Sequence, residues 1–117
     1  MGPDMLPTDL IAAPYETDFR RARKVSGWKV DNCFTGWYRR AVLDYGTHRV
    51  QIDASAPCKN LVCFAPDDGR NFIALEPVTN INNAFALAAR GVADTGTVLL
   101  APGDKLDASI SIAAAKL

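Results

Sequence analysis

A carboxylate in an unusual setting, Glu76, is the residue of this chain best suited to acid–base chemistry. It ends the apolar run Asn71–Leu75 and is followed directly by Pro77. Proline cannot donate to a strand ladder, so we expect the strand to stop beside the carboxylate. A carboxylate at the end of an apolar strand loses water on at least one side, which raises its pKa toward the range of a general base. The alternative is a strand-end glutamate in solvent, which the pattern taken alone favours.

A second cluster combines aromatic rings with a carboxylate. Trp28 and Trp37 flank Asp31 and Phe34 within ten residues. Flat aromatic faces pack against the C–H faces of a sugar ring, while the sugar hydroxyls need acceptors such as a carboxylate. This pattern predicts a sugar-binding group made of Asp31, Phe34 and Trp37. The alternative is core tryptophan beside a turn aspartate, and composition alone favours it.

The composition argues against several other kinds of site. Thirteen basic and thirteen acidic residues cancel, so no overall field recruits nucleic acid or an anionic membrane. The single histidine, His48, and the three cysteines without CxxC spacing make a metal site improbable. No membrane-spanning stretch or secretory signal is visible, so we expect free thiols at Cys33, Cys58 and Cys63 in a reducing cytoplasm.

The elements that must position these groups are short strands bounded by turn residues. With 117 residues, 49 % of them hydrophobic, the chain fits one globular domain. Apolar runs and alternating patterns predict strands in six ranges: Ala41–Tyr45, Arg49–Asp53, Asn60–Ala65, Phe72–Glu76, Gly96–Leu100 and Asp107–Ile112. Alternation in the fourth of these places Phe72, Ala74 and Glu76 on one face.

The remaining segments complete the predicted organisation. A short helix is expected within Asn80–Arg90, ended by Gly91, and a turn over Ala101–Asp104. Residues 1–24 contain three prolines and no sustained period, which indicates an N-terminal arm. Several closely spaced strands without a βαβ rhythm predict an antiparallel β-sandwich over residues 25–117.

Short motifs along the chain resemble those of aldose 1-epimerases, the galactose mutarotase-like proteins. They occur here in that family's order: Asp4-Met5-Leu6-Pro7-Thr8, Asp18-Phe19-Arg20, Val30-Asp31-Asn32-Cys33-Phe34-Thr35-Gly36-Trp37, Phe72-Ile73-Ala74-Leu75-Glu76-Pro77-Val78-Thr79, Asn83-Ala84-Phe85 and Leu100-Ala101-Pro102-Gly103-Asp104. The resemblance runs from about Asp4 to the C-terminus and corresponds to the C-terminal half of the family's proteins.

The resemblance implies a large antiparallel β-sandwich, the supersandwich, and interconversion of the α and β anomers of an aldohexose such as galactose or glucose. Glu76 matches the family's general base, which removes the proton of the anomeric hydroxyl. Asp31 matches the aspartate that binds sugar hydroxyls. No metal or organic cofactor is implied.

The resemblance also implies an incomplete active site. The family's acid is a histidine that belongs to the half not matched here, and His48 does not fall in its motif. Half a sandwich leaves strand edges and apolar faces uncovered, so we expect the chain to associate with a missing N-terminal half or with itself. A chain without its acid is expected to be nearly inactive alone, since a general acid contributes on the order of 10²- to 10⁴-fold. The alternative function is a non-catalytic carbohydrate-binding or sugar-sensing module.

Overall fold

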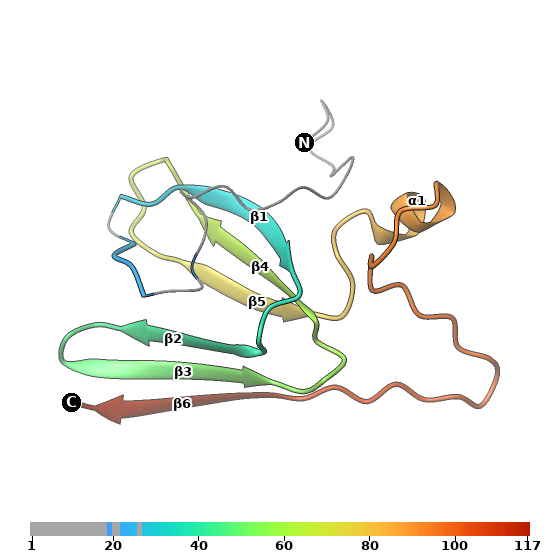
Figure 1. The fold of residues 1–117 in the computed structure, drawn as a ribbon. Coiled ribbons are helices and arrows are strands. Elements are labelled where there is room, and N and C mark those ends of the chain that lie inside the picture. The colour runs from blue at the N-terminus through green and yellow to red at the C-terminus, as the bar shows by residue number, and fades with distance from the viewer. Residues whose placement is uncertain (1–18, 20–21, 26) are drawn as a thin grey trace.

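The fold consists of two three-stranded antiparallel sheets and one short helix (Figure 1). The computed structural model describes residue 19 and residues 22–25 and 27–117. The elements within them are, in chain order, β1 (Val30–Thr35), β2 (Arg40–Asp44), β3 (His48–Ala54), β4 (Asn60–Ala65), β5 (Ala74–Val78), α1 (Ala84–Ala89) and β6 (Ile110–Lys116). The expected all-β class with antiparallel strands is confirmed. The arm predicted over residues 1–24 falls almost wholly outside the described residues.

The first sheet has the strand order β1-β4-β5 and carries one of two apolar clusters. The strand predicted over Asn60–Ala65 is confirmed as its central strand, β4. Buried Val30, Cys63 and Ala65 form the cluster on one face of this sheet. Side chains opposite one another on paired strands point to the same face, so the register fixes which residues share this core face and which lie on the other.

The strand that carries Glu76 differs from its prediction at both ends. β5 begins at Ala74 and continues through Pro77 to Val78, so Glu76 lies within the strand and proline does not stop it. Pro77 pairs with Leu61 of β4. β5 is one of the two outer strands of its sheet, and an outer strand tolerates proline where the missing N–H would face away from the neighbour.

The second sheet has the order β2-β3-β6 and contains the predicted hairpin. The hairpin closes where the Tyr45 N–H donates to the His48 carbonyl (3.0 Å) and the Gly46 N–H to the Asp44 carboxylate (2.8 Å). Ion pairs across the strands, such as that of Arg49 with Asp44 at 2.8 Å, hold the carboxylate pKa below its ordinary value. These pairs are exposed, so each adds little to the free energy of folding.

The helix expected within Asn80–Arg90 is present but shorter, and its end follows the prediction. After the last helical residue, the Gly91 N–H donates to the Ala88 carbonyl and the Val92 N–H to the Leu87 carbonyl, both at 3.0 Å. This pair of bonds is a Schellman motif, and Val92 packs against the buried cluster that contains Leu87. Within the described part of the chain, no helix has the length and apolar character needed to cross a membrane.

The segment between the helix and the last strand contains the clearest error of the sequence prediction. Residues 96–100 were expected to form a strand, but they have no regular secondary structure. Val98, Leu99 and Leu100 are exposed, and no described strand pairs with them. The turn over Ala101–Asp104 is confirmed by a hydrogen bond from the Asp104 N–H to the Ala101 carbonyl (2.9 Å). A strand-forming sequence stays irregular when it has no partner strand, because its backbone then gains no ladder.

Candidate functional site

Glu76 lies in the middle of the outer strand of the first sheet, and its side chain is exposed. The predicted loss of water around this carboxylate does not occur. The side chain points out of the plane of the sheet, and no described residue covers it on that face. Ala74 and Glu76 do share a face, as alternation predicted, because they lie opposite Phe64 and Val62 of β4.

Asp31 lies on the same face of the sheet as Glu76. Asp31 is opposite Phe64, and Phe64 is opposite Ala74, two residues before Glu76. The two carboxylate-bearing residues are therefore two strands and two residues apart, or about 12 Å between Cα atoms. Within the described residues, neither carboxylate makes a hydrogen bond or an ion pair, whereas those of Asp44 and Asp53 are held by arginines. The carboxylates of Asp31 and Glu76 are thus available to a ligand.

The other two predicted sugar-binding residues are not part of this face. Phe34 lies opposite Leu61 and packs into the core cluster on the reverse side of the sheet. Trp37 follows β1, and its indole N–H donates to the Cys58 carbonyl at 2.7 Å, which makes it an anchor between two chain segments. Trp28 packs against the core cluster and the Phe19 ring, at 4.2 Å between centroids. Trp28 therefore corresponds to the core alternative, whereas Trp37 is held by its hydrogen bond to the Cys58 carbonyl.

Aromatic rings do lie on the carboxylate face, but they are residues that sequence reasoning did not assign to the site. Phe64 shares the face with Asp31, and its ring contacts that of Phe72 at 5.9 Å between centroids. The guanidinium of Arg70 lies over the Phe72 ring at 5.3 Å and also forms an ion pair with Asp68 (2.8 Å). In the sequence, the spacing that places Phe72 on the same face as Glu76 could have identified this aromatic group. We call Asp31, Glu76, Phe64 and Phe72 the carboxylate face.

The loop after β5 flanks this face and is held from both sides. The Asn60 side chain donates to the Thr79 carbonyl (3.1 Å), and the Ile81 N–H donates to the Thr95 carbonyl (3.0 Å). Ile81 belongs to a buried cluster with the helix, and that cluster packs on Cys33, which shares the face of Asp31. The loop and helix therefore form a wall beside the carboxylate face.

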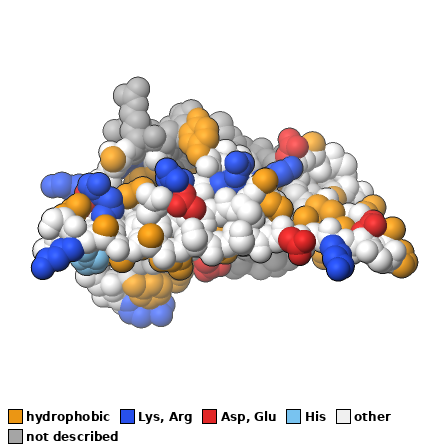
Figure 2. Space-filling model, turned by 90° about the horizontal axis from the view of Figure 1, so that it is seen from below, with side chains coloured by type: hydrophobic (Ala, Val, Ile, Leu, Met, Phe, Trp, Pro, Cys, Tyr) orange, Lys and Arg blue, Asp and Glu red, His pale blue; other side chains and the backbone are white. Residues whose placement is uncertain are grey.

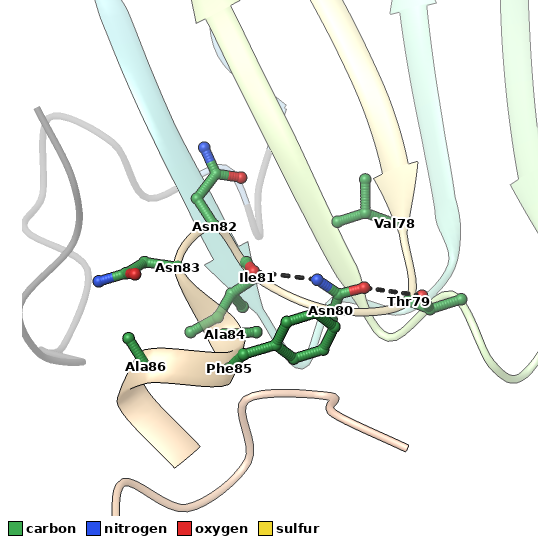
Figure 3. Close-up of a pocket in the computed structure, with 9 residues that line it drawn as sticks. All are labelled: Val78, Thr79, Asn80, Ile81, Asn82, Asn83, Ala84, Phe85 and Ala86. Carbon is green, nitrogen blue, oxygen red and sulfur yellow. Dashed lines mark hydrogen bonds between the residues drawn. The ribbon is translucent and has the colours of Figure 1, made fainter. Parts of the chain in front are cut away.

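An open depression lies along this wall and is shown in Figure 3. It is lined by nine residues from the end of β5 to the first turn of α1: Val78, Thr79, Asn80, Ile81, Asn82, Asn83, Ala84, Phe85 and Ala86. The Asn80 amide donates to the Ile81 carbonyl (3.2 Å) and is thus used within the loop. The Phe85 ring is 74 % exposed. Amides and an exposed ring suit polar ligands, but the depression is built from a single stretch of chain.

The thiols near the carboxylate face are not poised for reaction. Burial raises the pKa of Cys63 to about 12, with the nearby Cys33 and Glu76 adding to the effect. Burial also raises the pKa of Cys33, against a hydrogen bond from the Asn82 backbone that lowers it. The thiolate is the nucleophilic form, so both groups stay inert near neutral pH. All three cysteines are free, as expected.

The single histidine is placed away from the carboxylate face. His48 begins β3 in the second sheet, where its ring stacks on Tyr45 (4.7 Å between centroids) and its Nδ1 lies 3.0 Å from the Thr47 hydroxyl. In the described ranges, no group of three or more histidine, cysteine, aspartate or glutamate residues could hold a metal ion.

Comparison of the chain with protein-family models, with curated proteins and with solved structures found no match.

Proposed function

We propose that the chain is part of an aldose 1-epimerase-like isomerase that interconverts the anomers of an aldohexose. The observation that carries the proposal is the carboxylate face. Asp31 and Glu76, two carboxylates without a hydrogen-bond or ion-pair partner among the described residues, share one side of a sheet with the contacting rings of Phe64 and Phe72. A sugar ring packs its C–H face on aromatic rings and donates its hydroxyls to carboxylates. The corresponding fold would be a galactose mutarotase-like supersandwich, of which these sheets form a part.

In this proposal Glu76 is the general base. It takes the proton of the anomeric hydroxyl, the electron pair forms the carbonyl at C1, and the C1–O5 bond breaks as O5 takes a proton from an acid. Rotation about C1–C2 and the reverse steps give the other anomer. Asp31 accepts hydrogen bonds from other hydroxyls and holds the ring in place. No described residue of the carboxylate face can serve as the acid, so we assign that role to a partner, the N-terminal half that the resemblance implies.

A second function, a non-catalytic carbohydrate-binding or sugar-sensing module, is favoured by two observations. Glu76 is exposed and the only histidine lies in the other sheet. A general base acts best with a pKa near the working pH, and desolvation is the usual means of raising a carboxylate to that range. Binding of hydroxyls to Asp31 and Glu76 needs neither desolvation nor an acid.

Anomer equilibration of freshly dissolved α-glucose and α-galactose, followed by polarimetry, tests the isomerase. We expect the chain to accelerate equilibration when the acid-bearing partner is present, and to be nearly inactive without it. Glu76→Gln should lower the rate of the complex by about 10²-fold or more because the amide cannot take the proton. Asp107→Asn is the matched control, an exposed carboxylate before β6 that should not matter. If Glu76→Gln retains the full rate, Glu76 is not the base.

Binding measured on the same proteins distinguishes the two functions. Titration with each sugar, followed by NMR shifts of the amides of β1 and β5, reports occupancy of the carboxylate face. Binding that is lost in Asp31→Asn, without any acceleration of anomer exchange even when the acid-bearing partner is present, supports the binding module and contradicts the isomerase. Absence of both binding and acceleration contradicts both functions.

A further inference from the structure

The last strand, β6, leaves one side of the second sheet open. All seven residues of Ile110–Lys116 are exposed, and Ile112 is 70 % exposed. The strand pairs with β3, and no other described residue pairs with its outer edge. Figure 1 shows β6 at the margin of the sheet, farthest from β1, β4 and β5. Figure 2 views the molecule from this side and shows hydrophobic side chains along its length, with acidic and basic groups between them.

The backbone groups that face outward can be assigned from the hydrogen bonds at the two ends of the ladder. The Ser55 N–H donates to the Ser109 carbonyl (2.9 Å), and the Leu117 N–H donates to the Thr47 carbonyl (3.0 Å). Antiparallel strands alternate between hydrogen-bonded and non-hydrogen-bonded pairs, so the odd-numbered residues of β6 bond to β3. The N–H and C=O groups of the even-numbered residues, Ile110, Ile112, Ala114 and Lys116, therefore point away from the sheet.

This edge lacks the features by which proteins prevent strand pairing. Two other outer strands have such features: β5 contains Pro77, and β2 contains the charged residues Arg40 and Asp44. β6 has no proline and a single charge, Lys116, at its end. Long uncharged edges without proline are templates for the addition of another strand.

We propose that β6 pairs with β6 of a second copy of the chain, antiparallel and about a two-fold axis at Ala113. In this register the backbone N–H and C=O of Ile112 bond to the backbone of Ala114 in the other copy. The backbone groups of Ile110 bond in the same way to Lys116 of the other copy. Both residues of each such pair have outward N–H and C=O groups, so the two edges form about eight backbone hydrogen bonds. The result is a closed two-fold interface and a continuous six-stranded sheet.

The side chains of β6 fit a second copy rather than an unrelated strand. The two Ala113 residues meet in a non-hydrogen-bonded pair, where Cα atoms approach to about 4.5 Å and small side chains are favoured. On one face, Ile112 lies beside Ala114 of the other copy, and the aliphatic stem of Lys116 covers Ile110. No like charges oppose one another in this register, and the chain carries equal numbers of acidic and basic residues, so two copies do not repel.

The size of the edge sets the strength of the association. A seven-residue strand gives an interface smaller than the usual 20–30 residues per partner, so we expect a dimer that dissociates in the micromolar range. β6 belongs to the sheet that does not contain Asp31 or Glu76. The dimer is thus independent of the proposed sugar chemistry, and neither result decides the other.

Sedimentation equilibrium over a range of protein concentrations tests the proposal. We expect a monomer–dimer equilibrium that Ala114→Pro weakens by about tenfold or more, because each copy loses one outward donor without losing a bond to β3. Val42→Pro is the matched control, since hydrogen bonds of Tyr45 and Ala54 show that position 42 also points outward, on the opposite edge of the same sheet. A monomer at every concentration, or equal weakening by both prolines, overturns the proposal.

Amide hydrogen exchange of the unmodified chain provides a test that needs no variant to fold. Exchange at Ile112 and Ala114 should slow as the protein concentration rises, while exchange at Ala113 and Ala115, which bond to β3, should not change. If the first two amides stay unprotected at high concentration, or become protected only when a different chain is added, pairing with a second copy is wrong.

Discussion

Replacing Gly96 with alanine is expected to destabilise the fold through the loop that follows β5. A Cβ at this position would overlap the Thr79 carbonyl oxygen and lie 2.8 Å from the Asn80 Cα. Both neighbours are backbone, so no side-chain rotation relieves the overlap. The loop is also tied to this segment by the hydrogen bond from the Ile81 N–H to the Thr95 carbonyl. The chain segments must separate, or the loop must shift.

The expected magnitude has two parts. The φ angle of Gly96 is +79°, a left-handed conformation that costs an L-residue about 1–2 kcal/mol. Forcing an extra carbon into a closed contact costs typically about 1–3 kcal/mol. We therefore expect Gly96→Ala to lower the free energy of unfolding by about 2–5 kcal/mol, measured by urea denaturation with the fluorescence of Trp28 and Trp37.

Gly103→Ala separates the two parts. Gly103 has a similar φ of +91°, but an added Cβ there meets no atom within 4 Å. This variant should show only the conformational cost, and the difference between the two variants measures the overlap with Thr79 and Asn80. Equal urea midpoints for the two variants would refute the reasoning, because they would mean that the loop and residue 96 are not in close contact in solution.

Two further predictions use the same unfolding assay. Trp37→Phe removes the donor to the Cys58 carbonyl, whereas the buried indole N–H of Trp28 has no acceptor among the described residues. Trp37→Phe should therefore lower the free energy of unfolding by about 1 kcal/mol more than Trp28→Phe does; the reverse order would contradict the anchoring role of Trp37. The pKa of Cys63 is raised to about 12 from an ordinary 9.0, so above pH 9 the unfolded chain releases the thiol proton while the folded chain keeps it. The free energy of unfolding should therefore fall above pH 9 by up to about 1.4 kcal/mol per pH unit. Cys63→Ala should flatten this decline between pH 8 and 10, and an unchanged slope would show that the thiol is not its source.

Elements with local signals were predictable from the sequence. The hairpin needs only Gly46 and Thr47 between two alternating runs, and β4 is an apolar stretch with a strong turn after it. The helix ends at Gly91 because that residue can close a Schellman motif with its own last turn. In each case the deciding interactions lie within a few residues of the signal, so tertiary contacts do not alter the outcome.

Elements that depend on distant neighbours were not predictable. Residues 96–100 have strand-forming side chains, but whether they form a strand depends on a partner elsewhere in the chain. Pro77 was expected to end β5, and it does not because β5 is an outer strand. The exposure of Glu76 to water depends on what covers its face of the sheet, which the local sequence does not contain either. Strand order is a property of the whole sheet, and no local pattern contains it.

The sequence identified the two carboxylates of the candidate site, Asp31 and Glu76, but not the aromatic residues that lie beside them. Alternation places Glu76 on one face of its strand, but whether Asp31 shares that face depends on the register of three strands. The same register puts Phe34 on the core face and Phe64 on the carboxylate face. Nearness in sequence made the tryptophans the obvious rings, whereas the sheet selects phenylalanines that are 30 or more residues from Asp31.

The exposure of Glu76 determines what the proposed isomerase requires. The Glu76 carboxylate is open to solvent, and the carboxylate face has no acid among its described residues. In the proposed isomerase, one event would remove both deficits: the arrival of a partner that covers this face and brings a histidine. Pairing of two β6 strands cannot supply this cover, because it extends the second sheet in its own plane and leaves the face of the first sheet open. Self-association at β6 and sugar chemistry at Glu76 therefore involve different surfaces, and a catalytic complex would use both the carboxylate face and a second, different partner.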